Sequence, residues 1–140
     1  MSQTNKPRYN QIQSFCFFQL IIERINQNPA VTGLDINSIK RKYRTPFNQL
    51  KDIITKYDIL HFIHFGLSED AYDAETATIL LQLGGVQDKT ELLDLVHQEF
   101  IRWTSYAIAG EKSEYKKLAN AIYEWKRKNF KDLFPRWILN

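Results

Sequence analysis

The chain has 140 residues, of which 44% are hydrophobic and 14% aromatic, and its formal net charge is +3 at pH 7. This composition is typical of a globular domain rather than a disordered chain, and five Gly with four Pro are few for an all-β fold. One cysteine, Cys16, excludes an internal disulfide framework and a Cys-rich zinc site, and it suits a reducing cytoplasm.

We expect one helical domain over residues 1–140, in which the polar residues 1–8 form a flexible arm. This arm lacks the apolar segment of a signal peptide. The longest apolar runs of the chain fall far short of the roughly 20 residues that span a bilayer. The sequence therefore predicts a cytoplasmic protein without a membrane partner.

The first helix is predicted from about Tyr9 to Asn26, where apolar residues recur at helical spacing. The run from Phe15 to Ile22 is short enough to fit a β-strand as well, and the flanking Gln and Glu residues favour a helix. Asn28-Pro29 follows and indicates a loop.

A short helix is predicted next, over residues 36–43, because Asp35 is a favourable N-cap. Pro46 disfavours helical geometry at Thr45, so we expect the chain to bend there before the following helix. Thr45 is the candidate N-cap of that helix, and Pro46 fits its first position.

Residues 46–65 are the hydrophobic centre of the sequence and end at Gly66, which fits a helix stop. Apolar residues occupy more than one face of this stretch, which predicts a buried helix with others packed around it. The pair Tyr57-Asp58 leaves open whether the stretch is one helix or two.

Further helices are predicted over residues 68–83, 88–110 and 113–133. Ser68 and Asp88 are their N-cap candidates, and Asp88 has capping-box spacing to Glu91. Gly84-Gly85 marks a stop between two of them. The sequence therefore predicts an all-α fold, a compact bundle of five or six helices around a buried central helix.

The sequence contains no catalytic motif. His61 and His64 are spaced i, i+3 and could share a helix face, but a metal site needs a third ligand and no H-E-x-x-H pattern is present. We expect both of them and His97 to be half-buried or to lie at an interface. The chain also lacks a P-loop, a G-x-G-x-x-G loop and a nucleophile elbow. We therefore expect a protein that is not an enzyme and that uses no metal and no cofactor.

Charge is distributed in three blocks. Residues 1–67 carry nine bases against four acids, a net charge of +5, and residues 101–140 carry the same numbers. Residues 68–100 carry one base against eight acids, a net charge of −7. Two basic ends around an acidic middle suggest one surface for a polyanion and another for a different partner. The alternative is that all three blocks are simply solvated.

Basic residues cluster on two of the predicted helices. The candidate nucleic-acid-binding residues are Lys40, Arg41, Arg44, Lys116, Lys117, Arg127 and Lys131. Clusters of this kind attract phosphate backbones through counterion release, without any base-reading motif. Tyr123 lies in the stripe of the last helix and could stack on an unpaired base or shield the core. A solvated face is an equally good interpretation of either cluster alone.

Two stretches resemble a known family, the small, all-helical subunit of type III CRISPR effector complexes. Residues 42–65 are similar to its pattern of a Lys-Tyr pair, here Lys42-Tyr43, followed by an amphipathic turn and a hydrophobic helix. Residues 114–127 are similar to its closing helix, in which an acidic-Tyr-basic start leads to a Trp, here Trp125, and then to basic residues. The family often has an Asn-Gly turn where this chain has Tyr57-Asp58.

The resemblance implies a non-catalytic subunit that lines the guide–target duplex and contacts its backbone through basic residues. Its partners would be RNA, other effector subunits and further copies of itself, with the acidic residues 69–99 free to meet a neighbour. No residue-level binding motif carries over, so the candidate residues rest on charge. The alternative is a helical protein-interaction adaptor or regulator without nucleic-acid binding, which a large exposed apolar patch would favour.

Overall fold

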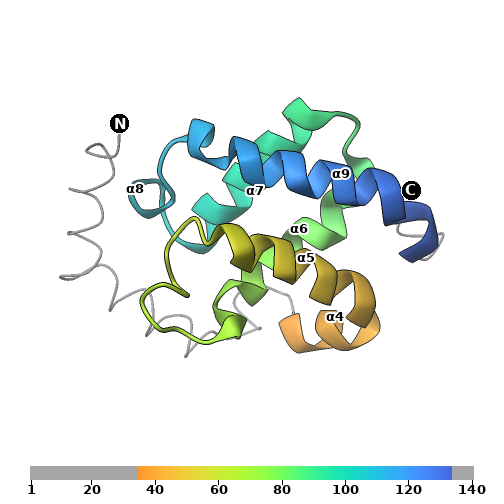
Figure 1. Cartoon of the computed structure of the whole chain (residues 1–140), viewed down its shortest axis with the longest axis horizontal. Helices are drawn as coiled ribbons and strands as arrows, with labels where there is room; N and C mark the ends of the chain where they lie inside the picture. Colours follow the sequence, from red (N-terminus) through yellow and green to blue (C-terminus); the bar gives the residue numbers. More distant parts are fainter. Residues whose placement is uncertain (1–34, 134–140) are drawn as a thin grey trace.

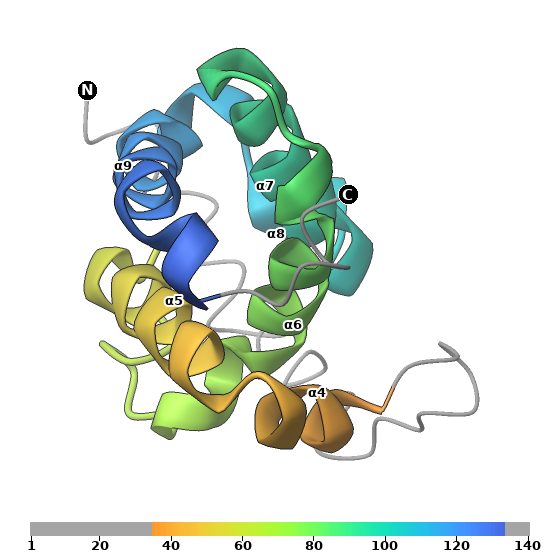
Figure 2. The ribbon, with the colours of Figure 1, turned by 90° about the vertical axis from the view of Figure 1, so that its right-hand side faces the viewer.

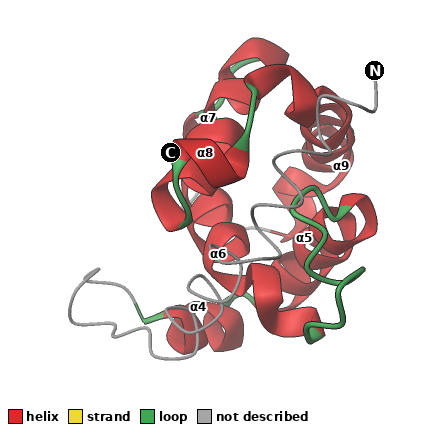
Figure 3. Cartoon of the chain, turned by 90° about the vertical axis from the view of Figure 1, so that its left-hand side faces the viewer, coloured by secondary structure: helices red, strands yellow, loops and turns green. Residues whose placement is uncertain are grey.

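The computed structural model of the chain describes residues 35–133, of which residues 130–133 are described without their side chains. The predicted helix from Tyr9 to Asn26 and the predicted arm over residues 1–8 lie outside the described residues. Every regular element between residues 35 and 133 is a helix, which confirms the all-α fold (Figure 3). The elements are α4 (Ile36–Lys42), α5 (Arg44–Tyr57), η3 (Glu69–Tyr72), α6 (Asp73–Gln82), η4 (Leu83–Gly85), α7 (Lys89–Trp103), α8 (Tyr106–Ala109), η5 (Lys112–Tyr115) and α9 (Lys116–Leu133), where η marks a 3-10 turn.

Four of the helices form a closed ring in two layers. Helices α5 and α9 lie side by side in one layer, and α6 and α7 form the other layer (Figures 1 and 2). Each of the four packs on two others, so that α5 and α7 both contact α6 and α9. Helix α4 closes one end by packing on α5 and α6. The arrangement confirms the predicted compact helical bundle.

The core is built from one apolar stripe of each surrounding helix. Phe47, Leu50 and Ile54 of α5 are fully buried and repeat at spacings of three and four residues. Leu118 and Ile122 of α9 belong to the same apolar cluster and are also fully buried. Burying side chains of this size contributes about 1.5–3 kcal/mol each, so the α5–α9 contact is a main source of stability.

The buried central helix of the bundle is α6, in which every residue from Asp73 to Leu80 is buried. The sequence predicts residues 46–65 for that place instead. Helix α6 is less conspicuous because it contains Thr76 and Thr78, which are ordinarily surface residues. Both hydroxyls donate to carbonyls of the preceding helical turn, and this satisfies their polar atoms inside the core.

Helix α5 ends at Tyr57 rather than at Phe65, so residues 46–65 form neither one continuous helix nor two helices, the two forms that the sequence left open. Asp58 adopts the left-handed conformation, with φ 46° and ψ 52°, and this ends the helix. Residues 59–66 then form successive turns, in which Phe62 is still fully buried. The chain therefore breaks at the pair that the sequence leaves ambiguous, and turns rather than a second helix follow the break.

Helix α5 also begins two residues earlier than predicted. A single buried residue, Tyr43, ends α4 and serves as the N-cap of α5, and its carbonyl accepts the first α5 hydrogen bond from the N–H of Phe47 (2.8 Å). Thr45 and Pro46 therefore lie inside the first turn, and the predicted N-cap at Thr45 is wrong. Pro46 costs no hydrogen bond there, because an N–H in the first turn has no partner within the helix.

The other predicted caps are confirmed. Asp35, Ser68 and Asp88 each accept a hydrogen bond from a backbone N–H two or three residues later. For Asp88 the donor is the N–H of Glu91 (2.9 Å), and the Glu91 carboxylate accepts in turn from the N–H of Gln87 (2.7 Å). The reciprocal bond of this capping box thus reaches one residue further back than in its usual form.

The helix predicted over residues 88–110 is interrupted. Helix α7 ends at Trp103, and the short α8 follows after a break at Thr104, whose hydroxyl donates to the carbonyl of Phe100 (2.5 Å). Ala107 is exposed on α8. The last predicted helix is confirmed as η5 followed by α9.

Candidate nucleic-acid interface

The first predicted basic cluster, Lys40, Arg41 and Arg44, lies where α4 meets α5, and we call it the elbow cluster. Lys40 is turned inward, and its Nζ lies 2.7 Å from Oδ2 of Asp73 on α6. Arg41 and Arg44 are exposed, and Nη2 of Arg41 donates to the hydroxyl of Ser38 (3.2 Å). The charge of Lys40 is therefore neutralised inside the molecule, whereas the two arginines face solvent.

Lys40 belongs to a charge network that joins α4 and α5 to the start of α6. Lys51 Nζ lies 2.8 Å from Oδ1 of Asp70 and 3.6 Å from Oδ1 of Asp73. Burial lowers the pKa of Lys51, but the hydrogen bond to Asp70 and the charge of Asp73 outweigh it and raise the pKa. The same hydrogen bond lowers the pKa of Asp70. Both pKa shifts favour the charged forms, so the network stabilises the contact of α4 and α5 with the start of α6.

The second predicted cluster, on α9, separates into different environments. Lys116 and Lys117 are exposed in the first turn, and no carboxylate of the described residues makes an ion pair with either. Arg127 Nη2 lies 2.8 Å from Oε1 of Glu124, and this hydrogen bond raises the pKa of Arg127. Lys131 lies on α9, but its side chain is outside the described residues. The open charge of α9 is thus at its start.

Tyr123 of the predicted stripe and its neighbour Lys126 contact residues at and just before the start of α7. Lys89 Nζ lies 5.7 Å from the ring centroid of Tyr123, so this ring already contacts a cation. Lys126 Nζ donates to the carbonyl of Val86 (2.6 Å), and burial lowers the pKa of Lys126. Both side chains are used within the fold.

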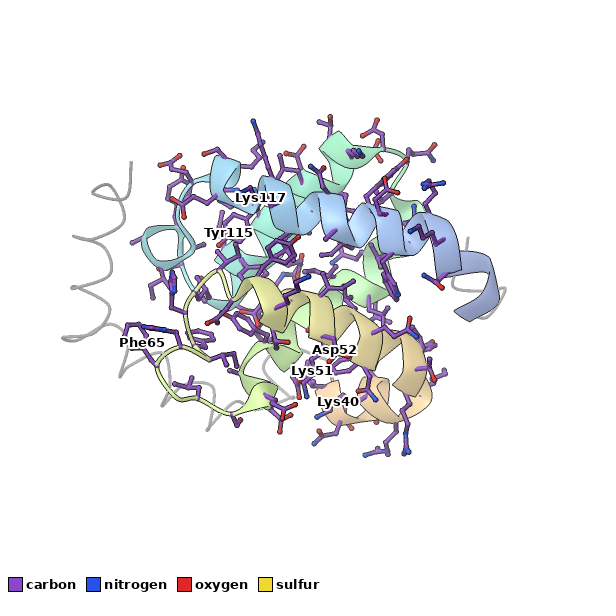
Figure 4. All side chains as sticks on the ribbon, in the orientation of Figure 1. Lys40, Lys51, Asp52, Phe65, Tyr115 and Lys117 are labelled. Carbon is purple, nitrogen blue, oxygen red and sulfur yellow. The ribbon has the colours of Figure 1, made fainter. Side chains whose placement is uncertain are left out.

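Helices α5 and α9 run antiparallel, and this keeps the two clusters apart. Trp125 Nε1 donates to Oε1 of Gln49 (2.7 Å) near the middle of the pair, and Tyr57 lines a groove together with the start of α9. Figure 4 shows Lys117 at the start of α9 and Lys40 on the α4 side of α5, next to Lys51. Because α5 is 14 residues long, about 20 Å separate its two ends.

A third exposed lysine, Lys56, lies at the same end as Lys116 and Lys117. It follows Gln49 by two helical turns on the same face of α5, and Gln49 reaches α9. Within the described part of the chain, no carboxylate pairs with Lys56. We call Lys56, Lys116 and Lys117 the open lysine cluster.

The acidic middle of the chain is largely engaged within the molecule. Asp70 and Asp73 belong to the charge network, Asp94 lies 2.6 Å from Lys112, and the buried Glu99 lies 3.3 Å from Arg102. The remaining helix-start acids described above serve as caps. Several acids of residues 69–99 are therefore engaged in ion pairs or caps, while Glu69, Asp70 and Asp94 remain exposed, and the expected contact with a neighbouring subunit stays a prediction.

An open groove separates the end of α5 from the start of α9, with a volume of about 500 Å³. Its lining includes Tyr57, Asp58, His61, Glu114, Lys116 and Lys117. One wall is thus the end of α5 with the turn after it, and the other is the start of α9. The lining of the groove thus combines two cations, aromatic rings and two carboxylates.

The turn that forms one wall of the groove is tied to the core through Asp58. Its carboxylate accepts hydrogen bonds from the N–H of Ile63 (3.1 Å), the N–H of His64 (3.0 Å) and the hydroxyl of Tyr72 (2.5 Å). The Tyr72 oxygen accepts in turn from the N–H of Leu60 (3.1 Å). The wall is therefore held by hydrogen bonds as well as by the buried apolar residues of the turn.

Tyr72 anchors this network because it is fully buried, with its ring 5.0 Å from that of Phe62 and 6.0 Å from that of Phe100. Burial and the hydrogen bond to Asp58 together raise the pKa of the Tyr72 hydroxyl, so it stays protonated and keeps its role as a donor. Asp58 is thereby held as a hydrogen-bonded structural carboxylate.

The three histidines do not gather. His61 and His64 lie in the turns after α5, with ring centroids 6.1 Å apart, so the common helix face predicted for them is wrong. His97 is buried, and its Nε2–H donates to the carbonyl of Gly110 (2.7 Å). Among residues 35–133, no three His, Cys, Asp or Glu side chains form a set that could hold a metal ion.

The described surface is poor in large apolar groups. Tyr106 of α8, 57% exposed, is its one large exposed hydrophobic side chain among residues 35–129. An adaptor that binds through an apolar patch would need several such side chains together. This surface therefore offers no specific support to the adaptor alternative.

Sequence reasoning did not identify Lys56, Tyr57 and His61 as neighbours of Lys116 and Lys117. The one sequence signal for this part of the groove was Asp58, which could end the helix after Tyr57 because Asp tolerates the left-handed conformation better than most residues. No sequence signal pairs the end of α5 with the start of α9, since the two segments lie far apart along the chain. Their proximity is a result of the ring topology.

No model of a protein family, no curated protein and no solved structure matches the chain. Among the described helices, none combines the length and the apolar character that crossing a bilayer requires. The functional interpretation therefore depends on the geometry of the groove, the charges around it and the resemblance noted in the sequence.

Proposed function

We propose that the protein is a non-catalytic subunit of a type III CRISPR ribonucleoprotein effector that contacts the backbone of guide or target RNA. The observation that carries the proposal is the open lysine cluster. Lys116 and Lys117 lie in the first turn of α9, and Lys56 lies in the last turn of the adjacent α5; all three are exposed, and no carboxylate of the described residues pairs with them. When unpaired lysines bind phosphates, the counterions condensed on the nucleic acid are released, and this release drives backbone binding.

The break of α5 supports the resemblance behind the proposal. The family often has an Asn-Gly turn at this place, and Asp58 here adopts the left-handed conformation that Asn and Gly also adopt readily. The same change of chain direction thus results from a different residue. Other effector subunits and further copies of the chain belong to the proposal as its protein partners.

A salt titration tests the RNA part of the proposal. Fluorescence anisotropy of the full chain with single-stranded RNA should give an affinity that falls linearly with log salt, with a slope of about −0.7 for each phosphate contacted. Changing Lys56, Lys116 and Lys117 together to Gln should lower the size of this slope by about two. Changing Lys128, exposed at the other end of α9, to Gln is the matched control.

Two results would contradict the proposal. One is the absence of RNA binding even at low salt, which would favour the adaptor alternative. The other is an unchanged slope in the triple variant, which would mean that the open lysine cluster does not contact phosphates. Purification of the chain from its native cells tests the effector part, and it should recover short RNA together with other protein subunits.

A further inference from the structure

The groove between the end of α5 and the start of α9 has the features of a site for one nucleotide. We propose that it takes a single unpaired nucleotide of a strand, with the phosphate on Lys116 and Lys117 and an amine-bearing base against Tyr57 and Glu114. This inference rests on the proposed function, because it specifies which part of a nucleic acid the same surface takes.

The size and openness of the groove fit such an occupant. Its volume of about 500 Å³ lies within the range of about 300–1,000 Å³ that small-ligand sites have. A base that is paired and stacked in a helix does not present its ring to a side groove, so the nucleotide that enters must be unpaired. An open groove also allows the strand to continue on both sides.

Two lysines can hold the phosphate. Lys116 and Lys117 lie in the first turn of α9, line the groove and are exposed without an ion pair to any described carboxylate. The backbone N–H of Lys116 already donates to the carbonyl of Ser113, so the ammonium groups rather than the helix terminus are the anion ligands. Lys56 adds a further positive charge at the same end of the layer.

Tyr57 supplies the surface for the base. It is half-buried at the end of α5, packs on the apolar cluster and lines the groove, so its ring is held in one place. Its hydroxyl makes no hydrogen bond to another residue of the described chain. Aromatic faces stack on any base, and His61 adds a second ring on the same wall.

The two carboxylates of the lining give the groove a base preference. The Asp58 oxygens already accept three hydrogen bonds within the fold, so the role of this carboxylate is to hold the turn that forms one wall of the groove. Glu114 lines the opposite wall and also takes part in an interaction within the fold, and a carboxylate can accept several hydrogen bonds at once. Carboxylates accept from exocyclic amines such as N4 of cytosine. Uracil presents a carbonyl at that position and is therefore the disfavoured base.

Anisotropy with labelled oligocytidine and oligouridine octamers tests the inference on the full chain. Oligocytidine should bind about five-fold more tightly than oligouridine, and the Glu114→Gln variant should lose this difference. The Lys116→Gln/Lys117→Gln variant should bind both octamers about 10-fold more weakly. Tyr57→Leu should weaken both about 10-fold, whereas Tyr57→Phe should bind like the native chain.

Matched controls separate the groove from general charge. Lys128→Gln removes one positive charge from the far part of α9 and should change octamer affinity less than two-fold, whereas Lys117→Gln, which also removes one charge, should weaken binding more. A blunt RNA duplex of the same length should bind more weakly than the octamers and should be insensitive to Tyr57→Leu. Thermal melts establish whether each variant folds. If Tyr57→Leu does not fold, the Lys116→Gln/Lys117→Gln variant still tests the proposal, because both lysines are exposed.

The inference is overturned if the double lysine variant binds oligocytidine like the native chain. If longer RNA still binds with a steep salt dependence in that case, the proposed function stands and the groove assignment alone fails. No binding of any RNA would remove both. An oligoglutamate peptide that displaces oligocytidine equally well would reassign the groove to an acidic protein partner, and equal displacement by free cytidine monophosphate would reassign it to a mononucleotide.

Discussion

The two ends of the α5–α9 layer differ in what surrounds their lysines. At the elbow end, the ammonium groups of Lys40 and Lys51 lie 2.7 Å and 2.8 Å from carboxylate oxygens of the α6 region. At the groove end, Lys116 and Lys117 are exposed, and no carboxylate of the described residues pairs with them. Both ends are basic in the sequence, but only the groove end keeps its lysine charge open to a ligand.

The difference shows how tertiary structure redistributes charge. The acidic middle of the sequence folds back on the first basic block, because α6 packs against α4 and α5 and brings Asp70 and Asp73 with it. The start of α9 lies beside the end of α5, where Asp58 is engaged by hydrogen bonds from the fold. A block of charge along the chain is therefore a binding surface only where packing leaves it uncompensated.

Reversing the charge of the groove end should have the largest effect. The Lys116→Glu/Lys117→Glu variant should bind single-stranded RNA about 100-fold more weakly, because two charge-assisted phosphate contacts become repulsive. Anisotropy at one fixed salt concentration measures the loss. Lys128→Glu on the same helix is the control, and an equal loss in both variants would contradict a localised site.

Removing the anchor of the groove wall should have the next largest effect. Tyr72→Phe deletes the hydroxyl that joins Asp58 to the N–H of Leu60, leaving buried polar groups without a partner. The free energy of unfolding should fall by about 2 kcal/mol, measured by urea denaturation. Tyr106→Phe, on an exposed ring, should change it by less than about 0.5 kcal/mol. A stable Tyr72→Phe variant would show that the turn does not depend on this network.

Removing an acidic partner of Lys40 should leave positive charge uncompensated at the elbow end, as it is at the groove end. Asp73→Asn removes the carboxylate that neutralises Lys40 and leaves Lys51 paired only with Asp70. The free energy of unfolding should fall by about 1.5 kcal/mol, because the lost pairs are partly buried. RNA affinity should rise about two-fold through the released charge. A fall in RNA affinity in the folded variant would contradict the proposed division between the ends.

The smallest expected effect is the pH dependence of the elbow network. The pKa of Asp70 is lowered in the fold, so its contribution is present above its ordinary value and is lost as the pH falls. The pKa of Lys51 is raised, so its contribution is present below its ordinary value and is lost as the pH rises. The full contribution therefore lies between about pH 4 and pH 10.

Urea denaturation from below pH 4 to above pH 10 measures that window. Because the Asp70 side chain is 65% exposed, solvent screening should keep its share below about 1 kcal/mol. Asp70→Asn should flatten the acidic limb of the stability curve, whereas Asp52→Asn, on an exposed residue of α5 outside the network, should leave it unchanged. An acidic limb that is equally steep in Asp70→Asn would place the pH dependence elsewhere.

Local signals in the sequence predicted the helical class and most helix starts. Asp35, Ser68 and Asp88 cap the elements that their side chains indicate, because a cap depends on neighbours within one turn. The end of α5 was predicted less well. Asp58 breaks the helix through bonds to residues further along the turn and to Tyr72, and no local pattern reports such bonds.

The residues of the candidate site also differ in whether local sequence or distant packing determines their environment. Lys116 and Lys117 were found from charge alone, and their exposure agrees with that expectation. Lys40 was chosen on the same grounds, but its partner Asp73 comes from a distant segment. Tyr57 was missed as a groove residue because its place beside α9 depends on the packing of the ring.

A comparison of two single variants tests the central claim most directly. Lys117→Gln and Lys40→Gln each remove one positive charge, and both chains are titrated with single-stranded RNA against salt. We predict that Lys117→Gln lowers the size of the salt slope by about 0.7, as expected for one lost phosphate contact, and that Lys40→Gln leaves it unchanged. Equal slopes in the two variants, or a larger change for Lys40→Gln, would contradict the account.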